Sequence, residues 1–383
     1  SNVGLIGKNA PYTGTFDGNG AEITADCILF AETDGAVIKN VNINSHVYNE
    51  KSAGIVQVAN NTSIDNCDVY ISLNYGICGG IAAEAYNSTI TNCCVTATGY
   101  IYEFGGIVYS TSGNTVIANC VLKNSGVNVT SLYGGIVGEA CGKTEIYNCA
   151  NSDIFNSRRS GGIVSYAEMS GLTLENNMYY KENDCCDVYY DIEKDECISE
   201  MVDRDSTVSE KDAEGLYIPA KLNEYVRANP NQVKGTTLKT WGVDYNNEPC
   251  FANNKNPELY LIKQSGVKAD TLINGDYARG ALPGNKVTVC GIADSAVVAV
   301  TDVNGNDIKL TKNEDGYEFT MPKCDVTVSA VLDTGINETT VIDGKTYVVV
   351  KNASDFVKAV KSIADGNSEL NVYIAENINL TAE

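Results

Sequence analysis

The sequence predicts a mostly β chain whose main part is a right-handed parallel β-helix (a solenoid), followed by an irregular cap and a second small domain of β-sandwich or β-grasp type. Three observations support this fold class. Residues 1–180 carry a repeat of 26 to 29 residues, two apolar columns of that repeat stay in phase, and its segments lack the i, i+3, i+4 spacing of an amphipathic helix. A chain of 383 residues also exceeds one ordinary core, so we expect several domains.

The first column of the repeat is an aliphatic residue two positions before an asparagine. The aliphatic residues are Ile38, Ile64, Ile90, Ile117, Ile146 and Leu174, and the asparagines after the first five are Asn40, Asn66, Asn92, Asn119 and Asn148. Asparagine tolerates the left-handed backbone of a tight corner, and amides stacked on successive turns hydrogen-bond one another. We therefore expect stacked aliphatic residues inside a coil over about residues 25–180 and an asparagine ladder at one corner.

The second column follows a glycine corner and reads Gly-Ile-Val or Gly-Ile-Ala. It lies at 54–56, 80–82, 106–108, 135–137 and 162–164. Short β-branched runs separated by Gly, Asn, Ser and Thr are typical of strands joined by tight turns, and strands on successive turns lie about 4.8 Å apart. The glycines predict a second corner at which the backbone takes positive φ.

The fourteen cysteines do not have the spacing of a disulfide framework. Four recur once per repeat, each directly after a ladder asparagine: Cys67, Cys93, Cys120 and Cys149. They predict buried free thiols in the same structural ladder, because side chains in register point the same way rather than toward each other. The less regular Cys185, Cys186, Cys197 and Cys250 leave pairing open. No CxxC pair has zinc-ligand spacing, so we expect neither a metal site nor a cofactor.

The chain is strongly acidic, with 27 basic against 49 acidic residues and a formal net charge of −22. Such a surface repels phosphate backbones and anionic lipids, so we expect no nucleic-acid partner. No run of eighteen apolar residues occurs, which predicts no membrane insertion. This composition suits a protein that works outside the cell.

Several sequence segments resemble those of a known repeat family. TGTFDGNGAEI at 13–23, CILFAETDGAVIKNVNI at 27–43 and the recurring Gly-Gly-Ile-Val and Ile-x-Asn-Cys phrases are similar to the GLUG-type β-helix repeats of large bacterial cell-surface proteins. The resemblance covers about residues 1–180. It implies that 181–256 forms an irregular C-terminal cap of the helix, because LKTWGVDYNNEPCF at 238–251 looks like the ending of such a segment.

Two further pieces follow the cap. Residues 257–334 alternate as strands around an Asn-Gly turn at 304–305, and they resemble the small β-rich repeat modules of Gram-positive surface proteins, which implies a spacer. Residues 335–383 read as strand, helix and strand, with Ser354 as the helix cap. In GLUG-type proteins a unit of this kind starts a further β-helix. We therefore expect 341–383 to dock on the N-terminal turn of another copy, as head-to-tail self-association, or on that of its own chain.

Catalysis has few candidates in this sequence. Glu84 and Glu139 each follow a corner glycine by four residues and lie two turns apart, about 9.6 Å, near the outer limit of an inverting carboxylate pair. Ser110 occupies the turn between them, so we expect two solvated surface glutamates and no catalytic residue. His46 is the only histidine, which excludes an HExxH motif and leaves one candidate base for a serine triad.

Ligand binding has better support, because tyrosines outnumber phenylalanines 23 to 7 and can sit at a surface. The segments that lead into the glycine corners hold Tyr75, Tyr100, Tyr102, Phe104, Tyr133 and Phe155, joined by Arg158 and Arg159. Aromatic residues with arginine are typical of binding hot spots. With the resemblance, this predicts part of a non-catalytic bacterial surface protein, secreted or cell-wall anchored, that binds a host protein or glycan. A polysaccharide lyase or glycosidase and a structural stalk remain the alternatives.

Overall fold

The computed structural model describes residues 5–47, 50–123, 126–152, 159–179, 186–194, 196–197, 207–208, 216–266, 269–292, 296–332, 334–336, 338–342, 345–364 and 370–380. The chain divides into two compact units, Ser1–Glu258 and Leu259–Glu383, and each is described by itself.

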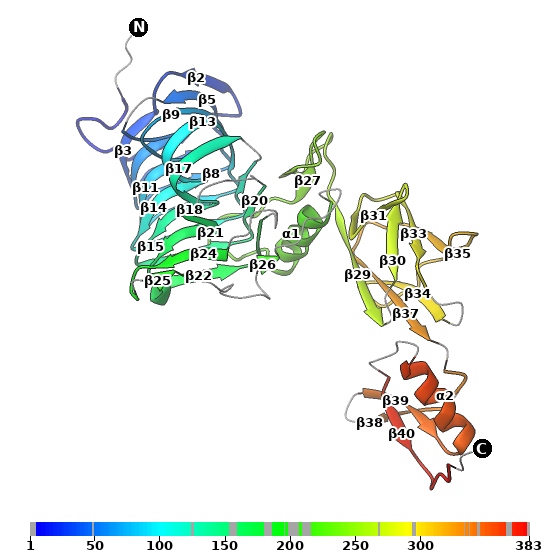
Figure 1. Ribbon diagram of the computed structural model, residues 1–383. Helices are drawn as coiled ribbons and strands as arrows, with labels where there is room; N and C mark the ends of the chain where they lie inside the picture. The colour runs from blue at the N-terminus through cyan, green and yellow to red at the C-terminus, as the bar shows by residue number, and fades with distance from the viewer. Residues whose placement is uncertain are drawn as a thin grey trace. The chain divides into compact units, whose positions relative to one another are not determined.

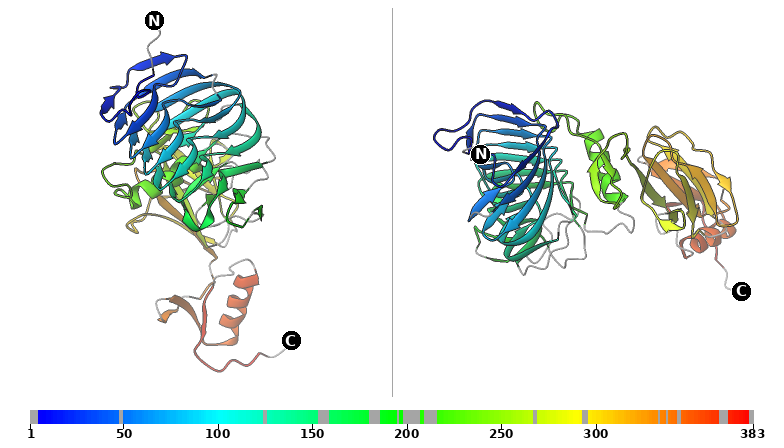
Figure 2. Two further views of the ribbon diagram at one scale, coloured as in Figure 1. Left: turned by 90° about the vertical axis from the view of Figure 1, so that its left-hand side faces the viewer. Right: turned by 90° about the horizontal axis from the view of Figure 1, so that it is seen from above.

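The larger unit is a parallel β-solenoid, as the repeat predicts (Figures 1 and 2). One side of the coil is a seven-stranded parallel sheet that takes one strand from each turn. Its strands are β1 (Thr15–Asp17), β4 (Val37–Lys39), β8 (Ser63–Asp65), β12 (Thr89–Thr91), β15 (Asn114–Ala118), β19 (Lys143–Tyr147) and β22 (Leu172–Glu175). The aliphatic column pairs in register from Ile38 to Leu174, and its five isoleucines are fully buried, which confirms the predicted stack.

The other sides of the coil belong to a second, larger sheet. After the asparagine corner come β2 (Glu22–Ala25), β5 (Asn42–Val47), β9 (Asp68–Asn74), β13 (Cys94–Gly105), β16 (Val121–Leu122), β20 (Ala150–Asn151), β23 (Asn177–Tyr179) and β26 (Thr207–Val208). Around the glycine corner lie β3 (Phe30–Asp34), β6 (Lys51–Ala53), β7 (Val56–Asn60), β10 (Ile77–Gly79), β11 (Ala82–Tyr86), β14 (Val108–Ser112), β17 (Val127–Gly134), β18 (Val137–Ala140), β21 (Arg159–Ala167) and β24 (Cys186–Asp191). A short 3₁₀ helix (Met169–Gly171) follows β21, and β25 (Glu196–Cys197) pairs antiparallel with β24.

The asparagine corner forms as predicted. All five ladder asparagines have φ between 52° and 56°. Asn66 donates to Asn40 Oδ1 at 2.6 Å, Asn119 to Asn92 at 2.8 Å, and Asn148 to Asn119 at 2.7 Å. The ladder is interrupted once, where Asn92 Nδ2 donates to Asp65 Oδ1 at 2.8 Å. The amides therefore satisfy one another along the coil axis.

The prediction of positive φ at the glycine corner is wrong. Gly54, Gly80, Gly106, Gly135 and Gly162 all keep φ outside the left-handed region. These glycines are needed because backbones approach closely: a Cβ on Gly80 would lie 2.1 Å from the carbonyl oxygen of Gly106 on the next turn. No side chain fits between turns packed at this distance.

The segment expected to cap the end of the coil lies along its side instead. It contains α1 (Tyr217–Ala228) and the hairpin β27 (Trp241–Val243) and β28 (Pro249–Phe251). The helix packs on outward-facing residues of four turns, Cys94, Ala118, Val121, Tyr147, Ala150 and Met178. The backbone of Lys239 donates to Asn92 Oδ1 at 2.9 Å, and Trp241 Nε1 donates to Asn119 Oδ1 at 2.8 Å. This lateral cover, residues 216–251, therefore seals the outer side of the asparagine ladder.

The four repeated cysteines are buried and free, as predicted. Each is at most 1% exposed, and the thiols stack along the coil next to the asparagines. Each Sγ contacts the carbonyl oxygen two residues earlier, as Cys93 does with Thr91 at 3.1 Å. Burial raises the pKa of the Cys93 and Cys120 thiols far above its usual range, which keeps them protonated. Cys250 is also free, Cys185 lies outside the described residues, and the side chains of Cys186 and Cys197 are not described.

The first part of the smaller unit contains two mixed or antiparallel sheets (Figure 1). One has the order β32 (Gly280–Ala281), β29 (Tyr260–Gly266), β37 (Val326–Leu332) and β34 (Ala296–Asp302). The other has the order β31 (Asp276–Tyr277), β30 (Asp270–Ile273), β33 (Lys286–Cys290), β36 (Tyr317–Thr320) and β35 (Thr311–Lys312). The expected Asn-Gly turn forms after β34, with φ of 80° at Gly305 and Asp302 N bonded to Asn306 O at 2.9 Å.

The last described segment is a three-stranded sheet with one helix. It consists of β38 (Thr339–Ile342), β39 (Lys345–Val350), α2 (Ala353–Ala364) and β40 (Val372–Ile374), in the expected strand–helix–strand order. Asn352, rather than Ser354, caps the helix, because its Oδ1 accepts from Asp355 N at 2.9 Å. No described helix is long and apolar enough to cross a membrane, since α1 and α2 have twelve residues each.

Candidate functional site

Three of the predicted tyrosines form an exposed patch on two neighbouring turns of the solenoid. The exposed fractions of Tyr75, Tyr100 and Tyr102 are 73%, 68% and 51%. Tyr100 and Tyr102 belong to β13, and Tyr75 follows β9 on the preceding turn. Tyr75 N donates to Tyr100 O at 2.8 Å, and Tyr102 N donates to Gly76 O at 3.0 Å, so backbone bonds fix the three positions relative to one another. We call these three residues the tyrosine patch.

Phe104 and Tyr133 do not belong to this surface, so their prediction as ligand-binding residues is wrong. Both are fully buried in the core, with ring centroids 6.2 Å apart. The alternation of side chains breaks within β13: Tyr102 faces out, and Phe104, two residues later, faces inward.

The two predicted arginines are not part of the patch as described. Arg158 lies outside the described residues, as does Phe155. Arg159 is exposed at the start of β21, where its Nη1 approaches Tyr166 Oη at 3.4 Å. It lies in register with Leu132, which in turn lies in register with Glu103, so Arg159 is two turns away from the tyrosine patch.

A second polar group lies at the glycine corner, next to the patch along β13. It consists of Lys51, Glu84, Glu103, Tyr109 and Glu139, and we call it the corner cluster. Tyr109 Oη donates to Glu103 Oε2 at 2.6 Å and lies within hydrogen-bond reach of Glu139 as well. Lys51 is paired with Glu84 and lies 5.9 Å from the centre of the Tyr109 ring. Five strands, β6, β11, β13, β14 and β18, supply one residue each.

Tyr109 is buried at the glycine corner against a glycine of the next turn. Its side chain is 5% exposed. A Cβ on Gly138, the residue before Glu139, would lie 2.9 Å from Tyr109 Cδ2, so the ring rests on this glycine. A tyrosine next to glycine at equivalent positions of adjacent turns is a sequence signal that could have identified this cluster.

The carboxylates of the corner cluster differ in their electrostatics. Burial acts to raise the pKa of Glu84, but hydrogen bonds from Lys51 and Tyr86 and the Lys51 charge hold it below its usual range. Burial raises the pKa of Glu139, assisted by the charge of Glu103. Glu84, Ser110 and Glu139 lie in register on three successive turns, as expected. Both glutamates are partly buried, so the prediction that they are solvated at the surface is wrong. Within the described ranges, no group of three or more His, Cys, Asp or Glu is placed to hold a metal ion.

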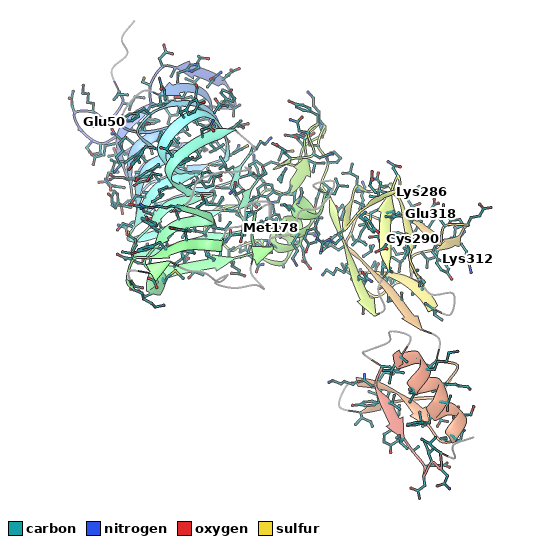
Figure 3. The ribbon with its side chains drawn as sticks, viewed as in Figure 1. Glu50, Met178, Lys286, Cys290, Lys312 and Glu318 are labelled. Carbon is teal, nitrogen blue, oxygen red and sulfur yellow. The ribbon has the colours of Figure 1, made fainter. Side chains whose placement is uncertain are left out.

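Two further polar features belong neither to the tyrosine patch nor to the corner cluster. His46 lies in β5 and is half-buried. In the smaller unit, a polar hollow is lined by Cys290, Lys312, Asp315 and Tyr317, among others, and Figure 3 labels the first two together with Lys286 and Glu318 on the same sheet. Lys286 and Glu318 form an ion pair, and Lys312 Nζ lies 5.6 Å from the centre of the Tyr317 ring. These two pairs each join side chains from neighbouring strands of this sheet.

A solved structure is similar to part of this chain. No protein-family model matches the chain, and no curated protein matches it. The solved structure is described as "a putative immunoglobulin A1 protease from Bacteroides ovatus". The identity is 20% and the TM-score 0.41, with 62% of this chain and 76% of that chain covered. A likeness at this level supports no statement about activity, and the fold described above depends on the strand pairing alone.

Proposed function

We propose that this protein is an extracellular bacterial surface protein of GLUG-repeat type, as found in Gram-positive bacteria, secreted or anchored to the cell wall. Its role is adhesion or ligand presentation, and it captures a glycan or a host protein on the outer face of the solenoid. The observation that carries this proposal is the tyrosine patch, in which three aromatic rings on adjoining turns are each more than half exposed.

The patch has the physical properties of a binding surface. Tyrosine offers a large apolar ring and a hydroxyl group, and it loses little conformational freedom when it is covered. The backbone under these rings is held by parallel strand pairing and backbone hydrogen bonds, so ligand binding does not have to order the backbone. Because the chain carries a net charge of −22, a neutral or basic ligand is favoured over an acidic one.

Screening against immobilised glycans and host extracellular proteins tests this proposal. Replacing Tyr75, Tyr100 and Tyr102 together by alanine should weaken capture about tenfold or more, because aromatic anchors contribute most of the binding energy of such surfaces. Tyr245→Ala is the matched control, since Tyr245 is 94% exposed in the turn of the lateral cover. Unchanged capture by the triple variant would contradict the proposal, and absence of any ligand would favour a spacer.

A carbohydrate-active enzyme is the second candidate, and the corner cluster is the observation that favours it. Glu103 and Glu139 share one tyrosine hydroxyl, and the raised pKa of Glu139 suits a general acid next to a second carboxyl group. Release of reducing or unsaturated sugar ends from polysaccharides would support this function. That activity must then disappear in Glu139→Gln and persist in the tyrosine triple variant at high substrate concentration.

A further inference from the structure

The outer surface of the solenoid after the glycine corner carries one row of side chains, with one residue from each turn. Figure 1 shows β11, β14, β18, β21 and β24 in succession along the coil, and the row also includes β3 and β7. Its residues lie in register from turn to turn and are all partly exposed: Glu32, Val58, Glu84, Ser110, Glu139, Tyr166 and Tyr190. Strands of neighbouring turns lie about 4.8 Å apart, so the row presents side chains at a regular interval.

The two tyrosines of this row are not required by the coil itself. The same position holds glutamate, valine or serine on the preceding turns, so the packing of the turns does not demand an aromatic ring there. Tyr166 and Tyr190 nevertheless lie on adjacent turns, with ring centroids 5.0 Å apart and planes tilted by 45°. The ring of Tyr189 stacks on that of Tyr166 at 6.2 Å. The three rings therefore form a partly exposed aromatic platform.

Polar groups lie beside this platform and fix its geometry. Arg159 Nη1 donates to Tyr166 Oη at 3.4 Å, and Ser165 Oγ donates to Arg159 O at 3.1 Å. The two turns before Tyr166 present a carboxyl group and a hydroxyl group in the same row. A carboxylate accepts hydrogen bonds, and hydroxyl groups both donate and accept them. We call the four residues Ser110, Glu139, Tyr166 and Tyr190 the corner strip.

We propose that the corner strip binds an uncharged linear polysaccharide that lies along the coil axis, with one sugar residue over each turn. The faces of the Tyr166 and Tyr190 rings pack against the C–H faces of two sugars, and Glu139 and Ser110 bond the hydroxyl groups of the next two. A regular polymer fits this surface because the row repeats at an interval close to the length of one sugar residue in an extended chain. The net charge of −22 disfavours an acidic polysaccharide.

This site differs from the two surfaces discussed under the proposed function. It shares Glu139 with the corner cluster but requires no catalysis there. It contains none of the three residues of the tyrosine patch and needs no ligand on that patch. The two sites can therefore be tested with separate variants of the same chain.

Titration calorimetry of the full chain with neutral oligosaccharides tests the proposal. The probes are cello-, xylo- and manno-oligosaccharides from the disaccharide to the hexasaccharide. For at least one series, we expect the affinity to rise up to the tetrasaccharide and then to level off, because the strip spans three steps between turns, about 14 Å. Tyr166→Ser combined with Tyr190→Ser should weaken binding by about tenfold or more. The coil should still fold, because it already holds Ser110 at this position. Tyr70→Ser is the matched control, since Tyr70 is 43% exposed on β9.

Several outcomes would overturn the proposal. They are absence of binding to every neutral series, equal affinity for disaccharide and tetrasaccharide, and unchanged binding by the double serine variant. Binding confined to polygalacturonate or to immobilised proteins would contradict the proposed ligand class. The alanine triple variant of the tyrosine patch should bind the oligosaccharides normally. If that variant loses them while the double serine variant retains them, the glycan belongs to the tyrosine patch, and this inference fails while the proposed function stands.

Discussion

Asn119 links the solenoid core, the asparagine ladder and the lateral cover through one side chain. Its Nδ2 donates to Asn92 Oδ1 at 2.8 Å and to Lys239 O at 2.9 Å. Its Oδ1 accepts from Asn148 at 2.7 Å and from the indole of Trp241 at 2.8 Å. The residue is fully buried and has φ of 56°, so both its amide and its backbone conformation are required.

Asn119→Ala should therefore destabilise the larger unit by about 3 kcal/mol, because it leaves buried donors and acceptors unpaired and puts alanine, which tolerates the left-handed region less well than asparagine, at this positive φ. Asn61→Ala is the control: its φ is 47°, but it is exposed and bonds only Asp34 at the surface. We expect Asn61→Ala to lower the free energy of unfolding by about 1 kcal/mol, from backbone strain alone. Chemical denaturation measures both, and equal losses would show that the buried hydrogen bonds contribute nothing.

Glu139 makes stability depend on pH in a defined direction. Its folded pKa is raised by burial, so between the unfolded and the folded pKa the native state binds more protons than the unfolded state. The stability that this group contributes is present at low pH and is lost as the pH rises through the folded pKa. Glu139→Gln should therefore be more stable than the wild type at neutral pH, and the difference should shrink on acidification. A variant that is less stable at neutral pH would contradict this assignment.

Some single residues could be predicted from the sequence and others could not. The ladder asparagines were predictable because one residue type satisfies two requirements, positive φ and a side chain that both donates and accepts. Positive φ was wrongly predicted for the glycines of the other corner. A repeated glycine can be required either by positive φ or by close approach of two backbones, and the sequence pattern is the same in both cases. Phe104 is buried because the side-chain alternation breaks within β13, and a prediction from strict strand alternation does not reveal such a break.

At the scale of elements, the lateral cover is held by its own small core. Trp241 is fully buried against Phe251, with ring centroids 4.8 Å apart, and Asn223 of α1 bonds both its N and its O. This core is distinct from the stacked interior of the coil. Loss of the tryptophan should therefore release the cover before it affects the solenoid.

Trp241→Ala should cost about 4 kcal/mol locally and make residues 216–251 sensitive to protease, while the β signal in far-UV circular dichroism persists. Trp241→Phe keeps most of the packing and is the conservative control. Cleavage sites are mapped by mass spectrometry of the fragments. Simultaneous loss of cover and solenoid would show that the two form one cooperative unit.

The cover also shows why elements differ in predictability. The coil follows from contacts between residues 26 to 29 positions apart, which repeat often enough to be visible in the sequence. The contact of Lys239 with Asn92 spans 147 residues and occurs once. Its residues were recognised as the end of an irregular segment, but nothing local indicates whether such a segment closes the end of the coil or lies along its side.

The whole molecule contains two units, and the buried thiols provide a reporter for one of them. The four ladder cysteines lie in the larger unit and are at most 1% exposed, whereas Cys290 and Cys324 of the smaller unit are partly exposed. A thiol reagent reaches a buried cysteine only when the surrounding structure opens. Labelling during denaturation therefore separates the unfolding of the two units.

We expect two thermal transitions in the full chain, one for residues 1–258 and one for 259–383, each matching that of the separately produced fragment. Each unit has its own core, so the stability of one does not require the other. Cys67, Cys93, Cys120 and Cys149 should react only in the transition of the larger unit, with equal counts before and after reduction, because they are free. Cys290 and Cys324 should react at or before the transition of the smaller unit. A single transition in which all six cysteines react together would contradict the division into independent units, and extra thiols from the ladder after reduction would contradict its free state.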